Sequence, residues 1–64
     1  MVKIKYGWKK EFEEKFKTEE EAINWVNKIL KEQEGGDAEQ YDNLTDIEMN
    51  VYEIFGDAGA KIEY

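Results

Sequence analysis

The chain has 64 residues, with nine lysines against sixteen acidic residues, so its formal net charge at pH 7 is −7. It contains no Cys and no His, which excludes disulfides and zinc sites built from thiolate or imidazole ligands as supports for so small a fold. Because 41% of the residues are apolar and nine are aromatic, we expect packing alone to hold residues 1–64 together as a single acidic α+β domain.

The N-terminal segment has the pattern of a β-hairpin. Apolar residues and lysines alternate over residues 2–6, which is the period of a half-buried strand. After a glycine turn the alternation resumes, with phenylalanines on one side and charged residues on the other. Pairing Lys5 with Glu13 places opposite charges across the two strands and brings Tyr6 opposite Phe12. We therefore predict a hairpin with this register.

Two features of the same segment fit a hairpin less well. Glu14 falls on the inward side of the second strand, and Trp8, Phe12 and Phe16 are spaced four residues apart, as on one face of a helix. The hairpin still accounts for the alternation in both arms, so it remains the prediction.

A helix over about residues 19–34 is the clearest element of the sequence. Thr18 and Glu21 form a capping box, in which the threonine hydroxyl accepts from the third backbone N–H and the glutamate reaches back to the N–H of Thr18. Apolar residues recur at helical spacing, and two consecutive glycines follow the helix as a stop signal. We expect Val26 of this helix and Phe12 of the hairpin to lie in the core.

The segment after the helix is harder to assign. Residues 37–46 show no period and are predicted to form an acidic loop. Residues 47–55 alternate between apolar and polar and are rich in strand formers. A second capping box, Thr45-x-x-Glu48, and an apolar face of helical spacing fit a second helix over residues 46–55 instead. We prefer the strand.

The C-terminal residues 60–64 again alternate between apolar and charged, which predicts a last strand after a glycine-rich turn. The predicted fold class is therefore α+β, in the order ββαββ. It has a four-stranded, mostly antiparallel sheet with one helix packed on one face.

The side chains that most enzymes use are missing from this chain. There is no Ser, Cys, His or Arg, which excludes serine and cysteine triads, imidazole bases and a guanidinium clamp for phosphate. Apart from the tyrosines, the only hydroxyls belong to Thr18 and Thr45, which the capping boxes already explain. Paired carboxylates would need a cleft that a domain of this size can hardly enclose. We therefore predict no catalytic residues and no enzyme.

The sequence also offers no recognisable metal or cofactor motif. Asp37, Glu39 and Glu48 would take the first, third and twelfth positions of an EF-hand loop. Tyr41 then stands at the fifth position and Asp42 replaces the glycine required at the sixth, so the pattern breaks. We expect no metal and no cofactor.

The distribution of charge indicates a binding surface. Residues 1–17 hold six lysines against three acids, whereas residues 18–64 hold three lysines against thirteen acids. An acidic surface with aromatic anchors would steer and bind a basic protein partner, and it would repel nucleic acids and anionic membranes. The predicted partner-binding residues are Glu32, Glu34, Asp37, Glu39, Tyr41, Asp42, Asp46 and Glu48. The plainer alternative is that these acids only keep a small domain soluble.

The chain resembles the small acidic proteins of phages and mobile elements, several of which are anti-CRISPR or anti-restriction inhibitors. The resemblance is carried by the stretch Thr18-Glu19-Glu20-Glu21-Ala22-Ile23-Asn24-Trp25 and by the closing Val51-Tyr52-Glu53-Ile54-Phe55-Gly56-Asp57. It implies a stoichiometric inhibitor of a nucleic-acid-processing enzyme. A duplex carries about one negative charge per 1.7 Å of its axis, so a row of carboxylates can occupy the basic channel of such an enzyme as a DNA mimic.

Two other classes stay open, namely a designed or idealised ββαββ scaffold and a small structural or regulatory interaction domain. The lysine- and glutamate-rich surface and the two capping boxes would suit a design, whereas the long acidic loop would not. No apolar run approaches the roughly 18 residues of a membrane span, and the N-terminus has no signal-peptide pattern. We expect a cytoplasmic monomer or small homo-oligomer.

Overall fold

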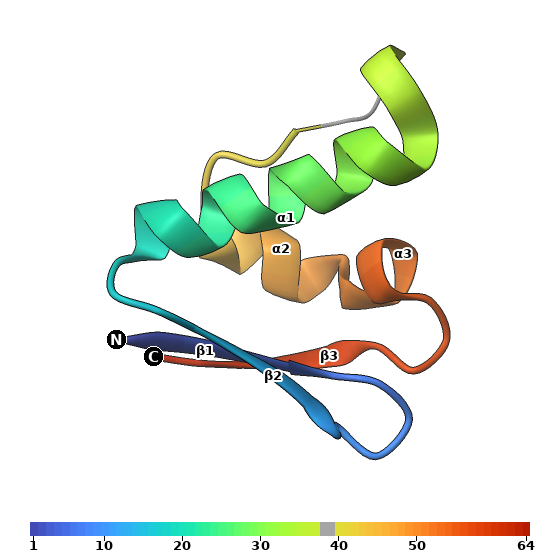
Figure 1. Ribbon diagram of the computed structural model, residues 1–64. Helices are drawn as coiled ribbons and strands as arrows, with labels where there is room; N and C mark the ends of the chain where they lie inside the picture. Colours follow the sequence, from blue (N-terminus) through green and yellow to red (C-terminus); the bar gives the residue numbers. More distant parts are fainter. Residues whose placement is uncertain (38–39) are drawn as a thin grey trace.

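The computed structural model describes residues 1–37 and 40–64, which fold into a sheet with helices on one of its faces (Figure 1). In chain order the elements are β1 (Val2–Tyr6), β2 (Phe12–Phe16), α1 (Glu19–Glu34), the 3-10 turn η1 (Gly35–Asp37), α2 (Leu44–Met49), α3 (Val51–Phe55) and β3 (Ala60–Glu63). The α+β class predicted from the sequence is confirmed. None of the helices within the described ranges is both long and apolar enough to cross a membrane.

The sheet has three antiparallel strands in the order β2-β1-β3, so the first strand is the central one. The predicted hairpin and its register are confirmed, because Lys5 lies opposite Glu13 and Tyr6 lies opposite Phe12. β3 pairs on the other side of β1, with Ile62 opposite Ile4. The alternation in β1 therefore points Val2 and Ile4 into the molecule and its lysines to the open face of the sheet.

The four-stranded ββαββ prediction is wrong in its third strand, because residues 47–55 belong to two short helices that are separated by a turn at Asn50. The described sheet has three strands, and this segment lies in α2 and α3. Leu44, Ile47 and Ile54 are the buried residues of the two helices, and their spacing of three and seven fits a helical face better than a strand. The last strand finds its neighbour in β1, so no further strand is needed to pair with it.

Helix α1 has the predicted bounds, and its capping box is confirmed in its essential contact. The Thr18 hydroxyl accepts from the backbone N–H of Glu21 at 3.2 Å. The Glu21 carboxylate turns back as expected but accepts from the N–H of Lys17, at 3.0 Å, rather than from that of Thr18. The acids of the first turn also complement the positive end of the helix dipole.

The core lies between the sheet and the helices and is entirely apolar. Val26 is fully buried there, as predicted. Phe12 is not, since 54% of it is exposed, and the prediction that it belongs to the core is wrong. Its parity is correct, but it stands at the first position of β2, which is an edge strand. Among the described residues, the eight buried hydrophobic side chains are Val2, Ile4, Ala22, Val26, Leu30, Leu44, Ile47 and Ile54.

A group of aromatic rings continues the core toward the β1–β2 turn. The ring of Tyr6 lies 5.3–5.7 Å from the rings of Phe12, Trp25 and Phe55, measured between centroids. Trp25 also contacts Phe16 at 5.4 Å. These contacts tie α1 and α3 to the hairpin, and they make Trp25 a packing residue rather than an exposed anchor.

Candidate binding surface

The fold separates the charges of the chain onto two sides. The sheet and its turns, residues 1–18 and 57–64, hold seven lysines and five acids, a net charge of +2. Residues 19–56, the segment in which the helices lie (the helical layer), hold eleven acids and two lysines, a net charge of −9, with Glu39 lying outside the described residues. Because the helices cover only one face of the sheet, this sequence asymmetry becomes a spatial one (Figure 1).

The acids of the helical layer have no lysine partner among the residues that the structure describes. The three ion pairs of the described residues all lie on the open face of the sheet. They are Lys5–Glu63 at 3.4 Å, Lys61–Glu63 at 3.7 Å and Lys15–Glu13 at 3.8 Å. Every acid of the helical layer whose side chain is described is exposed. This layer therefore presents uncompensated carboxylates to solvent, whereas the sheet face is partly neutralised.

The predicted partner-binding residues fall into two groups. Glu32 and Glu34 are exposed near the C-terminal end of α1. Asp42, Asp46 and Glu48 are exposed at and after the start of α2. The side chain of Asp37 and the whole of Glu39 lie outside the described part of the chain.

Tyr41 is placed differently from its acidic neighbours. Asn27 of α1 holds its backbone from both sides, with the amide Nδ2 donating to the Tyr41 carbonyl at 3.0 Å and Oδ1 accepting from its N–H at 2.8 Å. The side chain is half buried and packs against the core. Tyr41 therefore anchors the returning chain to the middle of α1, about 10 Å before Glu34 at a rise of 1.5 Å per residue.

The start of α2 is fixed by a cap that the sequence placed two residues too late. Asn43, not Thr45, is the N-cap residue, and its Oδ1 accepts from the backbone N–H of Asp46 at 2.9 Å. Its Nδ2 donates to the Asp46 carboxylate at 3.2 Å. Asn50 then donates to the Asp46 carbonyl at 2.8 Å and ends the helix. Asp46 is thus held within this turn.

Large apolar side chains stand exposed among these acids. Met49 is 76% and Tyr52 is 69% exposed, on the outer side of α2 and α3. The Tyr52 ring lies against Gly59, where an added Cβ would approach Cε1 to 2.9 Å, so this glycine makes room for the ring. The predicted strand hid Met49, because it set this residue in line with buried residues, whereas it left Tyr52 on the outward side. A helical reading of the spacing would have revealed the exposure of Met49.

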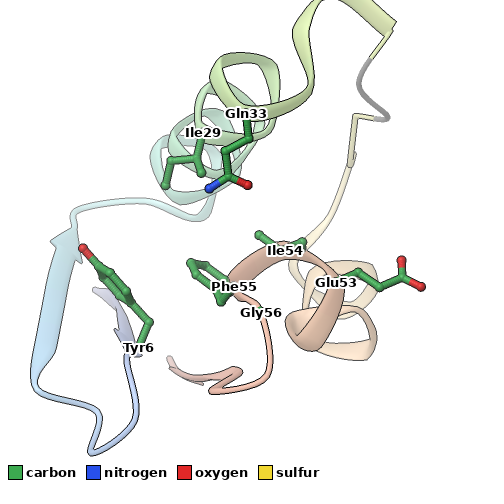
Figure 2. Close-up of a pocket in the computed structure, with 7 residues that line it drawn as sticks. All are labelled: Tyr6, Ile29, Gln33, Glu53, Ile54, Phe55 and Gly56. Carbon is green, nitrogen blue, oxygen red and sulfur yellow. The ribbon is translucent and has the colours of Figure 1, made fainter.

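A hollow of about 470 Å³ opens between α1, α3 and the end of β1 (Figure 2). Most of its wall is apolar and comes from Tyr6, Ile29, Ile54 and Phe55. The titratable residues in its lining, Tyr6 and Glu53, come from different elements, and the Glu53 carboxylate points away from the hollow. The lining residues therefore place no acid and base facing each other across the hollow.

Electrostatic interactions and burial shift the pKa of Glu63, Glu11 and Tyr64. The charge of Lys5 lowers the pKa of Glu63, and the N–H of Lys9, donating at 2.8 Å, lowers the pKa of Glu11. Partial burial raises the pKa of the Tyr64 hydroxyl, and a hydrogen bond to Glu48 and its negative charge raise it further. Glu63 lies in β3, Glu11 precedes β2, and Tyr64 follows β3.

Within residues 1–37 and 40–64, no group of three or more acidic side chains is gathered closely enough to hold a metal ion. Comparisons with family models, curated proteins and solved structures each return no match.

Proposed function

We propose that this chain is a non-catalytic binding protein whose acidic helical layer docks on the basic surface of a partner protein. The observation that carries the proposal is the charge separation of the fold, with a net −9 over residues 19–56 and a net +2 over the remainder. Uncompensated exposed carboxylates produce a field that steers a cationic surface toward this side of the molecule.

The exposed apolar residues supply binding affinity, which charge alone does not provide. Steering speeds association, whereas affinity comes mainly from buried aromatic and apolar contacts at the centre of an interface. Met49 and Tyr52 are exposed beside Glu48 and Glu53, so apolar contacts and carboxylates share one surface. We take the centre of the interface to be the outer side of α2 and α3.

The partner class that suits this surface is a nucleic-acid-processing enzyme met in the cytoplasm. A basic channel that binds a phosphate backbone also accepts a protein that presents carboxylates in its place. In this proposal the chain is an inhibitor that occupies the nucleic-acid-binding surface of a CRISPR effector or a restriction nuclease. It binds no nucleic acid itself.

The test is a DNA-cleavage assay with a panel of purified restriction nucleases and CRISPR effectors. The wild-type chain should inhibit at least one of them at a molar ratio near one, and excess duplex DNA should relieve the inhibition. The double variant Glu48→Gln/Glu53→Gln should need roughly tenfold more protein for the same effect, because two carboxylates of the interface are lost.

A matched control separates the surface from the overall charge. The variant Glu13→Gln/Glu63→Gln changes the net charge by the same amount but on the sheet, and it should inhibit as the wild type does. Equal losses in both variants, or no inhibited enzyme in the panel, would contradict the proposal.

A further inference from the structure

Strand β2 is an edge strand whose outer side has no neighbouring strand in the described part of the chain. The strand order β2-β1-β3 leaves it at one margin of the sheet. An edge strand offers unpaired N–H and C=O groups that a further strand can bind, and proteins usually protect such edges. What β2 presents along this edge therefore decides whether a second chain can pair with it.

The charges along β2 are complementary to those of a second, antiparallel copy of the same strand. The segment from Glu11 to Lys17 begins with acids and ends with lysines. If two copies pair antiparallel about a two-fold axis at Glu14, each acid on the open face meets a lysine and each phenylalanine meets a phenylalanine. The opposed pairs are Glu11 with Lys17, Phe12 with Phe16, and Glu13 with Lys15, each occurring twice.

Neighbouring registers lose this match. An axis at Glu13 places Phe12 opposite Glu14 and Glu13 opposite itself, and an axis at Lys15 places Lys15 opposite itself. A shift by a single residue would set core-side residues against open-face residues. The register about Glu14 is the one that satisfies both charge and shape, at the cost of setting two Glu14 side chains opposite each other.

The exposure of Phe12 supports the same arrangement. This ring is 54% exposed, and it stacks on Tyr6 with a centroid distance of 5.3 Å. Phe16, which would lie opposite it in the second copy, is half buried and already held by Trp25. Pairing would cover Phe12 with a fixed aromatic ring, which a single copy leaves in water.

The other edge of the sheet is less suited to this role. β3 is shorter than β2, and two antiparallel copies of it would bring together only one kind of charged pair, Lys61 with Glu63. Glu63 is already bound to Lys5 of the neighbouring strand at 3.4 Å, whereas the looser Lys15–Glu13 pair, at 3.8 Å, lies within β2 itself.

We propose that a second copy of this chain binds along β2, so that two sheets join into one of six strands. The two-fold axis passes between the two Glu14 residues and is perpendicular to the sheet, which leaves both helical layers on the same side. This dimer does not depend on the proposed docking of the acidic layer, and either proposal can fail alone.

Charge reversal tests the proposal without relying on a single variant. Sedimentation equilibrium of the wild type should show a dimer with a dissociation constant on the order of 100 µM, as suits a small interface. Glu13→Lys and Lys15→Glu should each weaken self-association at least tenfold, because like charges then oppose each other. Mixed in equal amounts, the two variants should form a heterodimer, since each lysine then meets a glutamate of the other chain.

Further variants check the axis and the edge. Glu14→Gln should tighten the wild-type dimer several-fold by removing the one repulsive pair. Lys61→Glu on the opposite edge should leave it unchanged, and circular dichroism should show each variant folded. The proposal is overturned by a wild type that stays monomeric at about 1 mM, a range in which even weak interfaces associate. Failure of the mixture to associate, or weakening by Glu14→Gln, would overturn it as well.

Discussion

Val26 and Phe12 show how differently two apolar side chains of one small domain contribute to stability. Val26 is fully buried among apolar neighbours, whereas Phe12 is 54% exposed and stacks on Tyr6. We expect Val26→Ala to lower the free energy of unfolding by roughly 2–3 kcal/mol, through lost burial and the cavity left behind. Phe12→Ala should cost no more than about 1.5 kcal/mol, the worth of an aromatic pair.

Urea denaturation measures this difference, at protein concentrations low enough to keep the chain monomeric. Equal losses for the two variants would contradict the burial described for Phe12. The sequence predicted the burial of Val26 because a long helix sets a clear apolar arc. It failed for Phe12 because parity fixes only which face a strand residue occupies, while burial depends on what covers that face.

Helix α2 is six residues long and depends on its cap more than a long helix would. Asn43 accepts from the N–H of Asp46 at 2.9 Å and donates to its carboxylate at 3.2 Å. We expect Asn43→Ala to destabilise the protein by about 1 kcal/mol, the usual worth of an N-cap. Asn43→Ser keeps an acceptor and should lose much less. Urea denaturation measures the free energy of unfolding of each variant. In Asn43→Ala, the rate of amide hydrogen exchange should increase in α2 before it increases in the rest of the protein.

Local sequence patterns predicted the hairpin and α1 correctly but predicted a strand where the structure has α2 and α3, and this difference has a physical cause. The hairpin and α1 are specified by contacts near in sequence: alternation, a capping box and terminal glycines. Residues 44–55 carry strand formers at Ile47 and Val51, yet the docking of Leu44, Ile47 and Ile54 on the core favours helix. That packing depends on β3 pairing with β1, a contact between opposite ends of the chain that no local pattern shows.

At the scale of the whole molecule, the sequence predicted an acidic region but not its arrangement. The asymmetry of charge is visible in the composition, whereas its division between a sheet face and a helical layer follows from the topology. The candidate surface was therefore only partly foreseen. Asp42, Asp46 and Glu48 lie near the start of α2, while the exposure of Met49 was obscured by the predicted strand.

The same separation of charge should weaken the folded state, because exposed acids without lysine partners repel one another. Glu34 is exposed at the last position of α1, where a negative charge also opposes the helix dipole. Glu34→Gln should therefore raise the free energy of unfolding by about 0.3–1 kcal/mol at low salt. Glu63→Gln makes the same change in charge but removes the partner of Lys5, so it should not stabilise.

Thermal unfolding of the three proteins in 10 mM and in 500 mM sodium chloride tests the argument. Added salt should raise the midpoint of the wild type and shrink the advantage of Glu34→Gln, since screening removes the repulsion that the substitution relieves. A wild type destabilised by salt would mean that attractive ion pairs dominate its electrostatics. The acidic layer would then lack the uncompensated charge on which docking to a basic partner depends.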